Sequence, residues 1–342
     1  MKDGEAAPPR RSRGRGQVRI EDVAKLAGVS AQTVSRVLRR PGQVSPATAS
    51  RIRDAIEASG YMPNLLAGAL ASNRSGVVAI LVPTIANPVH AAPVQGLSDA
   101  LRQEGYQVLV GNTGYDPETE HALVAAFLGR RVDGIVLTGA ALAPATQRML
   151  LQSRVPAVQL WELPESPVDM AVGFDNAALG DTVARHLAER GYRRLAVVRH
   201  AAPSDTRSAA RAAGFAAAVR ALGLPPPREL VTDRPADLAE APNLLRQLRG
   251  ADAVFCVGDQ LAIGLLLACR RQGVAVPEQL AIIGVGDSDL AALVTPALTT
   301  VRIPRYELGH TAGTLLLERF SGAGAGSRVV DVGFELVMRE ST

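Results

Sequence analysis

The sequence predicts a small all-helical N-terminal domain followed by a larger, doubly wound α/β core with two lobes. Two patterns carry this prediction. Apolar residues recur at helical spacing in about the first sixty residues, and from Val77 onwards short β-branched runs alternate with amphipathic segments. The length of 342 residues points the same way, because one small helical domain needs far fewer.

The stretch from Val18 to Leu38 is predicted to form two short helices joined by a tight turn. Gly28 can adopt the positive φ that closes the first helix, and Ser30 can cap the free N–H groups of the second. We expect an inward apolar stripe on both helices, formed by Val23, Leu26, Ala27, Val34, Val37 and Leu38. This combination is typical of a helix-turn-helix.

The second of these helices presents small and polar residues to water. Ala31, Gln32 and Arg36 are predicted to read base edges in the DNA major groove. Thr33 and Ser35 are predicted to hold phosphates and set the register. An ordinary helical hairpin is the alternative and shares the apolar spacing, but the turn, the cap and the polar face together favour DNA binding.

The basic charge of the chain is confined to its N-terminal part. Residues 1–75 hold 13 Lys and Arg against 6 Asp and Glu, which leaves 24 against 27 for the remainder. This asymmetry is expected where only the N-terminal part meets a polyanion. Residues 1–17 read as a disordered basic tail, and residues 18–62 as the DNA-binding headpiece, with a third helix that Ser45 opens and Gly60 ends.

Residues 18–76 resemble the headpiece and hinge of LacI/GalR-family transcription regulators. The resemblance runs through the TVSRVL helix, the GYMPN turn at residues 60–64 and the hinge over residues 63–76. It implies a hinge helix that orders on operator DNA, with Leu70 pushed into the minor groove and Ala67 facing the groove one turn earlier. A flexible linker with an incidental leucine is the alternative for this segment.

The core is predicted to contain buried parallel strands at 77–82, 107–111, 134–137, 157–160, 195–198, 253–257 and 281–285. Covering helices are predicted at 117–130, 176–190, 208–222 and 260–272. So many strands fit two lobes with a cleft, where ligands collect at the carboxyl ends of strands. The family resemblance covers residues 77–342 and implies a periplasmic-binding-protein-like core, with lobe one at 77–174 and 304–332 and lobe two at 175–303 and 333–342.

Several function classes are disfavoured by the sequence. There is no GxSxG elbow, HExxH helix or GxxxxGK loop, so neither an enzyme nor a cofactor is expected. Cys256 and Cys269, the only cysteines, are too few for a disulfide framework or a metal cluster and suit a reducing cytoplasm. No apolar run is long enough for a membrane span, and no secretory signal is recognisable.

The candidate ligand contacts of the core follow from the resemblance. It places Arg211, in the segment RAAGF, as the effector clamp, and Arg207 lies one helical turn earlier. Two arginines in a cleft favour an anion, although either could be a solvated surface charge. Strand-end positions add the other candidates: Val89, His90, Trp161 as a stacking platform, Glu162, Phe174 and Asp287. For His90 the alternative is a helix-start residue packed on its neighbours, and for Trp161 a partly exposed loop hydrophobe.

Two departures from the family pattern concern acidic residues. This chain has Gly258-Asp259 and Gly286-Asp287 where many members carry Asn-Asp and an aspartate pair. Contacts to a neutral pyranose are therefore partly missing, and Asp259 is expected to cap its helix. The segments DMAVGFDN, LVPTIANPV and VDVGFEL, and the pattern GY-D-PE-E at 114–120, resemble gluconate-utilisation repressors within the family. This implies a sugar acid such as gluconate, or a phosphorylated relative, as effector.

The resemblance implies a homodimeric repressor on a pseudo-palindromic operator, released or retained as the effector changes the angle between the lobes. Because no leucine-heptad tail follows GFELVMRE, a dimer is expected rather than a tail-held tetramer. An activator or a corepressor-dependent regulator would share the same architecture. A solute-binding protein would need an export signal and no headpiece, and an enzyme would need turnover from the cleft residues.

Overall fold

The computed structural model describes residues 18–39, 41–62, 74–139, 141–202, 204–232, 240–324 and 326–342. The predicted basic tail and the hinge positions Ala67 and Leu70 lie outside the described residues. The chain divides into two compact units, Met1–Ser75 and Gly76–Thr342.

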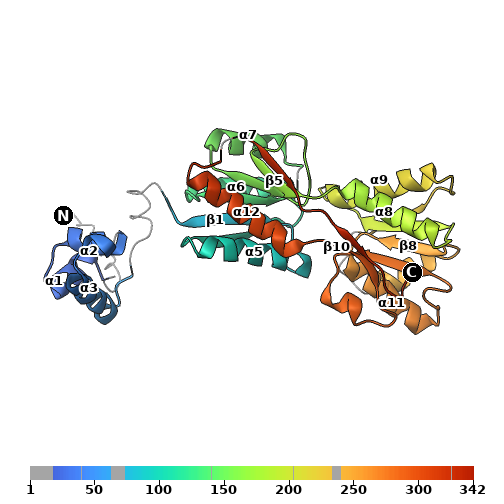
Figure 1. Ribbon diagram of the computed structural model, residues 1–342, viewed down its shortest axis with the longest axis horizontal. Coiled ribbons are helices and arrows are strands. Elements are labelled where there is room, and N and C mark those ends of the chain that lie inside the picture. The colour runs from blue at the N-terminus through green and yellow to red at the C-terminus, as the bar shows by residue number, and fades with distance from the viewer. Residues whose placement is uncertain are drawn as a thin grey trace, which may run out of the picture. The chain divides into compact units, whose positions relative to one another are not determined.

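The first unit contains three helices in its described part, α1 (Ile20–Ala27), α2 (Ala31–Arg39) and α3 (Pro46–Ser59), with a 3-10 turn η1 at Pro41–Gln43 (Figure 1). Gly28 has φ 65° and ends α1. The Ser30 hydroxyl accepts the N–H of Thr33 at 3.2 Å at the start of α2. The predicted turn and caps are confirmed, and so is the cap of α3 by Ser45, which accepts the N–H of Thr48.

Two of the residues expected in the apolar stripe are exposed. Leu26 keeps 64% of its surface and Leu38 keeps 39%. The buried stripe of α1 consists of Val23, Ala24 and Ala27, and Leu26 lies about 100° around the helix from its centre. Alanines on that stripe suit a close approach of α3. Leu38 lies in the last turn of α2.

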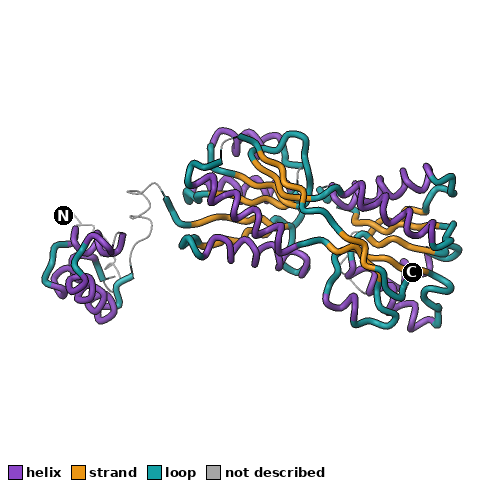
Figure 2. The backbone as a smooth tube through the Cα atoms, viewed as in Figure 1, coloured by secondary structure: helices purple, strands orange, loops and turns teal. Residues whose placement is uncertain are grey.

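The second unit contains two six-stranded sheets, one in each lobe (Figure 2). The first sheet is parallel throughout, in the order β11-β5-β4-β3-β1-β2. Its strands are β1 (Val77–Val82), β2 (Gln107–Asn112), β3 (Gly134–Thr138), β4 (Ala157–Leu160), β5 (Met170–Gly173) and β11 (Arg328–Asp331). The helical segments of this lobe are η2 (Pro88–His90), α5 (Ala91–Arg102), α6 (Pro117–Gly129), α7 (Pro144–Ser153) and α12 (Arg305–Phe320).

The second sheet has the order β12-β10-β9-β8-β6-β7, and only β12 is antiparallel to its neighbour. Its strands are β6 (Leu195–His200), β7 (Arg228–Thr232), β8 (Ala253–Cys256), β9 (Ala281–Val285), β10 (Thr299–Arg302) and β12 (Glu335–Val337). The helices α8 (Asn176–Glu189) and α9 (Thr206–Ala221) cover one face, and α11 (Asp259–Gln272) covers the other (Figure 1). The shorter α10 (Ala241–Gln247) and η4 (Asp289–Ala292) belong to the same lobe.

Close helix pairs tighten each lobe. A Cβ atom at Gly309 of α12 would lie 1.8 Å from the carbonyl oxygen of Pro93 in α5, and one at Gly180 of α8 would lie 2.1 Å from that of Arg211 in α9. Only glycine permits such an approach of two backbones. The predicted fold class, a helical headpiece and a two-lobed α/β core, is confirmed.

The edge strand β2 departs from the expectation of a buried strand. Its Leu109 and Val110 are 37% and 44% exposed, because β2 has only β1 as a neighbour in the sheet. Both cysteines are buried and free. Among the described residues, no helix combines the length and the apolar character that crossing a membrane requires.

The chain passes between the two sheets three times, after β5, after β10 and after β11 (Figure 2). The parallel strands of both sheets end toward these crossings, so the loops that follow them meet between the lobes. This is where the structure brings the polar side chains of the core together.

Candidate functional site

The headpiece presents the outer face of α2 as its candidate DNA surface. Gln32 and Arg36 are exposed and lie one helical turn apart, whereas Ala31, Thr33 and Ser35 are half-buried. The Thr33 hydroxyl lies 2.9 Å from the Ser30 hydroxyl. Gln32 and Arg36 are therefore the longer side chains of this face that reach away from the headpiece core.

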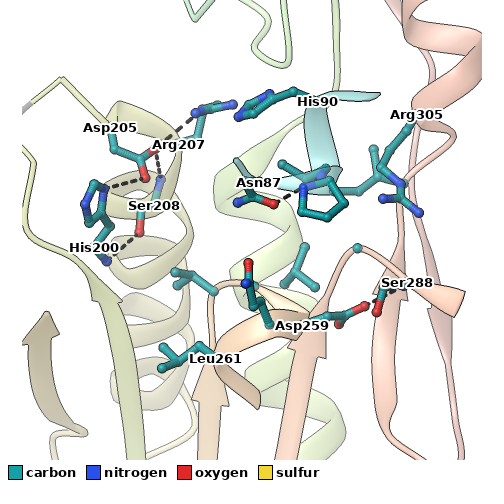
Figure 3. A pocket seen from close by; sticks show the side chains of 18 of the residues that line it. Asn87, His90, His200, Asp205, Arg207, Ser208, Asp259, Leu261, Ser288 and Arg305 are labelled. Atoms are coloured by element: carbon teal, nitrogen blue, oxygen red, sulfur yellow. Dashed lines mark hydrogen bonds and ion pairs between the residues drawn. The ribbon is translucent and has the colours of Figure 1, made fainter. Parts of the chain in front are cut away.

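A cavity of about 290 Å³ lies between the two lobes of the core. Its volume is close to the lower limit of small-molecule sites. Figure 3 shows His90 and Asn87 of lobe one facing Arg207, Asp259 and Leu261 of lobe two. Lobe one lines it with Asn87, Pro88, Val89, His90, Tyr115, Trp161 and Arg305, and lobe two contributes the β6–α9, β8–α11 and β9–η4 connections.

Five of the eight expected effector contacts line this cavity: Val89, His90, Trp161, Arg207 and Arg211. Glu162, Phe174 and Asp287 do not. Glu162 accepts a hydrogen bond from the Thr206 hydroxyl instead, and Phe174 is fully buried beneath the Arg211 guanidinium at 5.7 Å. Asp287, at φ 48°, accepts from Arg302 at 2.7 Å and from Arg339 at 2.6 Å.

Arg211 is held rigidly in the floor of the cavity. Its Nε donates to Oδ1 of Asn176 at 2.8 Å, and Nη1 donates to the carbonyl oxygen of Val257 at 2.9 Å. Burial, and after it the charge of Arg207, lowers the pKa of Arg211 to about 10. Arg211 therefore stays protonated at neutral pH, with its orientation set before any ligand arrives.

Arg207 lies at the boundary between the lobes. Its Nε is 3.4 Å from Oδ1 of Asp205, and its guanidinium lies 5.7 Å from the centre of the Trp161 ring. Trp161 is 2% exposed, and Arg207 covers one face of its ring, so the ring is not the open stacking platform that was expected. At φ 78°, Trp161 also adopts a left-handed backbone conformation that non-glycine residues rarely have.

Asp205 links the polar residues on the α9 side of the cavity. It accepts the N–H of Ser208 at 3.3 Å, and Nδ1 of His200 lies 3.4 Å away (Figure 3). Burial alone would raise the pKa of Asp205, but the close approach of His200 and the charges of Arg207 and Arg211 hold it well below its usual range. Asp205 is therefore a carboxylate at neutral pH.

His90 is buried at the cavity with both ring nitrogens unpaired among the described residues. Its ring meets Trp161 edge-on at 6.0 Å between centroids. Burial, with a smaller effect of the Arg207 charge, lowers the pKa of His90 to about 3. The imidazole is thus neutral and offers one donor and one acceptor.

Asp259 does not cap its helix, so that expectation was wrong. No side chain caps α11, and the Asp259 carboxylate accepts the N–H of Ser288 at 2.6 Å and the hydroxyl of Thr300 at 2.5 Å. It ties the start of α11 to the two neighbouring strand ends. Burial raises the pKa of Asp259.

Sequence reasoning missed Tyr115, His200, Asp205, Ser208 and Arg305 as cavity residues. For Tyr115 a signal was present, because the GY-D-PE-E pattern was singled out without a role. Among the described residues, no group of His, Cys, Asp and Glu side chains could hold a metal ion.

Comparison with known proteins agrees with both units. Residues 19–64 match the bacterial regulatory proteins of the lacI family, and residues 184–342 match the periplasmic binding protein-like domain. The chain is 37% identical over 336 residues to the HTH-type transcriptional regulator GntR of Pseudomonas aeruginosa, covering 97% of each chain.

Two solved structures extend this likeness. A LacI-family transcriptional regulator from Silicibacter pomeroyi superimposes with a TM-score of 0.88 at 29% identity, over 95% of this chain and 99% of that one. The transcription regulator GntR from Chromobacterium violaceum is 37% identical with a TM-score of 0.73, over 78% and 98%. The chain therefore belongs to the LacI family of bacterial transcriptional regulators, with a helix-turn-helix that binds DNA and a core that binds an effector.

Proposed function

We propose that the protein is a homodimeric repressor whose affinity for a pseudo-palindromic operator is controlled by a hydroxylated organic anion, a sugar acid such as gluconate. The observation that carries the ligand class is the pair of arginines, Arg207 and Arg211, that α9 directs to the cavity. The resemblance to gluconate-utilisation repressors and the GntR relatives support the same class.

The charges around the cavity favour an anion. Arg207, Arg211 and Arg305 line it, against the carboxylates of Asp205 and Asp259. Both carboxylates already accept hydrogen bonds from the protein, so each has less acceptor capacity left for a neutral sugar than a free carboxylate has. At residue 286 the lining is a glycine, which supplies no carboxylate at all.

His90 and its surroundings favour hydroxyl groups on that anion. A buried donor and acceptor left without partners cost about 1–3 kcal/mol each. A hydroxyl can accept from one imidazole nitrogen or donate to the other, so a polyhydroxy chain removes this cost. Val89, adjacent in η2, supplies an apolar contact on the same side.

On DNA, each α2 helix reads one half-site. Gln32 and Arg36, with Ala31, contact base edges, and Thr33 and Ser35 hold phosphates. The hinge, with Ala67 and Leu70 at the minor groove, orders when the lobe angle places the two hinges of the dimer at the right separation. Coupling of this kind is typically about 1–3 kcal/mol and is reciprocal, so operator changes effector affinity by the same factor.

Thermal unfolding with added ligands tests the ligand class. We expect D-gluconate to stabilise the full-length protein, by about 2.7 kcal/mol at a hundredfold excess over its Kd. D-Glucitol, which has the same carbon chain and no carboxylate, is the matched neutral control and should give a much smaller shift. Stabilisation only by neutral sugars or purines would contradict the anion.

Operator binding tests the regulatory role. Labelled operator DNA is titrated with protein in the presence and absence of the stabilising ligand, at one salt concentration because phosphate contacts depend strongly on salt. Weaker binding with ligand identifies an inducer, and tighter binding a corepressor. If the affinity for operator is the same with and without ligand, binding of ligand in the cavity does not control DNA binding.

A further inference from the structure

The carboxylate of Glu162 is held at the end of β4 by two neighbouring strands. Glu162 follows Trp161, whose left-handed backbone, at φ 78°, turns the chain directly after the strand. A Cβ atom at Gly173 of β5 would lie 2.3 Å from the carbonyl oxygen of Glu162, an approach that only glycine permits. A Cβ atom at Gly139, after β3, would lie 3.5 Å from Oε2 of Glu162. The position of this side chain is therefore fixed from within lobe one.

The hydrogen-bond donor to Glu162 belongs to lobe two. Thr206, the first residue of α9, donates its hydroxyl hydrogen to the carboxylate, with Oγ1 at 2.9 and 3.0 Å from the two oxygens, in a partly buried contact. Two residues earlier, the exposed Ser204 hydroxyl donates to the carbonyl oxygen of Tyr115 at 2.8 Å. The β6–α9 connection is therefore bonded to lobe one at the ends of two strands, β4 and β2. The contact with Glu162 is the stronger of the two, because a carboxylate is a better acceptor than a carbonyl group.

The hydrogen bond to Glu162 fixes the first turn of α9, from which the cavity arginines extend. Arg207 follows Thr206 directly, and Arg211 lies one turn further along. The Arg207 guanidinium lies 5.7 Å from the centre of the Trp161 ring, and Trp161 directly precedes Glu162. The hydrogen bond and the contact between cation and ring therefore lie side by side. Separation of the lobes would break both.

We infer that Glu162 and Thr206 form a latch between the lobes, in which Glu162 is a positioning residue for Arg207. The latch holds the lobes together before any ligand arrives. An anion that binds between the lobes then supplies less of the free energy needed to bring them together, so its apparent affinity is higher. The anion rests on the proposed function, whereas the latch rests on the hydrogen bonds alone.

Trp161 reports on the latch without any ligand. It is the only tryptophan, it is 2% exposed, and Arg207 of the other lobe covers one face of its ring. Thr206→Val replaces the hydroxyl with a methyl group of similar size. We expect acrylamide to quench Trp161 at least twice as strongly in Thr206→Val as in the wild type. Thr206→Ser keeps the donor and should return quenching to the wild-type value.

Thr182→Val is the matched control. It makes the same replacement in α8 of lobe two, at a half-buried threonine whose hydroxyl donates to the carbonyl oxygen of Ala178 in its own helix at 2.9 Å, so quenching should equal that of the wild type. If Thr206→Val is quenched like the wild type, or if Thr206→Ser is quenched like Thr206→Val, the hydroxyl does not hold the lobes together and the inference is overturned.

Glu162→Met removes the acceptor and tests the same contact from lobe one. The double variant Glu162→Met, Thr206→Val should be quenched no more strongly than either single variant, because all three lack the same hydrogen bond. If the increase in the double variant is instead the product of the two single increases, the residues act independently and there is no latch.

Calorimetric titration connects the latch to affinity. We expect Thr206→Val to bind D-gluconate about tenfold more weakly than the wild type, the effect of losing one hydrogen bond to a carboxylate. An unchanged gluconate Kd in Thr206→Val would overturn the link to affinity. If the wild type does not bind gluconate but Trp161 is still quenched more strongly in Thr206→Val, the sugar-acid proposal fails and the latch is retained.

Discussion

Arg211 in the second turn of α9 and Asn176 at the start of α8 are joined by a hydrogen bond of 2.8 Å from Nε to Oδ1. The Asn176 amide donates in turn to the carbonyl oxygen of Trp161 at 2.9 Å, at the end of a lobe-one strand. A chain of two hydrogen bonds therefore connects the most buried cation of the cavity to the opposite lobe. Asn176 and the Trp161 carbonyl therefore orient the Arg211 guanidinium, although neither of them needs to contact the ligand.

Arg211→Ala should abolish the ligand response, while the ligand-free protein still binds operator, because the headpiece is a separate unit. Arg211→Lys keeps the charge but cannot reach two acceptors in fixed directions, so we expect gluconate affinity to fall more than tenfold. Calorimetry and operator titration measure the two effects. Loss of operator binding together with the ligand response would indicate a structural role instead.

The free energy of unfolding should decrease as the pH is lowered, because of His90. Its pKa is 6.5 in the unfolded chain and about 3 in the fold, as burial excludes the charged form and Arg207 opposes it more than Asp205 favours it. Between these values only the unfolded chain takes up the proton, so stability is complete above pH 6.5 and is lost as the pH falls. From pH 6.5 to 5 the loss is about 2 kcal/mol.

His90→Asn removes this titration while retaining a polar side chain. Its unfolding free energy should therefore decrease less steeply between pH 6.5 and 5 than that of the wild type, as measured by chemical denaturation at each pH. Equal slopes for the two proteins would show that His90 is not the residue responsible.

Gly309→Ala should destabilise the core, because the new Cβ would lie 1.8 Å from the carbonyl oxygen of Pro93 and must push α12 away from α5. Overpacking of this kind costs about 1–3 kcal/mol, which exceeds the gain in helix propensity from alanine. Gly324→Ala is the control, with its nearest contact at 3.8 Å. The measurement is the free energy of unfolding of each variant. If Gly309→Ala leaves this free energy unchanged, the close approach of α12 to α5 is refuted.

Gln32→Ala should relax base preference without preventing DNA binding, because a side chain that reads a base edge contributes about 1–3 kcal/mol of discrimination. Thr33→Ala should weaken binding to all sequences alike if Thr33 holds a phosphate. Competition between operator and unrelated duplexes at fixed salt separates the two. If Gln32→Ala weakens binding to both duplexes equally, Gln32 contacts the DNA backbone rather than a base edge.

Most central strands could be predicted because a strand covered on both faces is a continuous apolar run. Val77–Val82 and Ala281–Val285 are buried over nearly their whole length. The predictions omitted β5, β7, β10, β11 and β12. Of these, β7 and β11 lie at sheet edges with exposed residues, and β12 has only three residues. The strands β5 and β10 are largely buried but have only four residues each, so each carries only a short version of the pattern.

The family resemblance pointed to Arg211, and Arg207 lies one turn earlier on the same helix, so their common direction follows from helical geometry. Val89, His90 and Trp161 were predicted from their positions after strands, and they also line the cavity. Asp287 follows a predicted strand, but its left-handed backbone and two arginine partners take it out of the cavity lining. The partners of Tyr115 and His90 come from distant segments, and such meetings depend on the tertiary arrangement.

The threefold passage of the chain between the sheets has a consequence for how such a regulator can diversify. No single cut in the gene separates one lobe from the other, because lobe one has segments before and after the stretch from β6 to β10, and lobe two has segments before and after β11. The headpiece, in contrast, is one contiguous block. Recombination can exchange the DNA-reading part whole, while a new ligand preference must accumulate substitution by substitution in the loops at the strand ends.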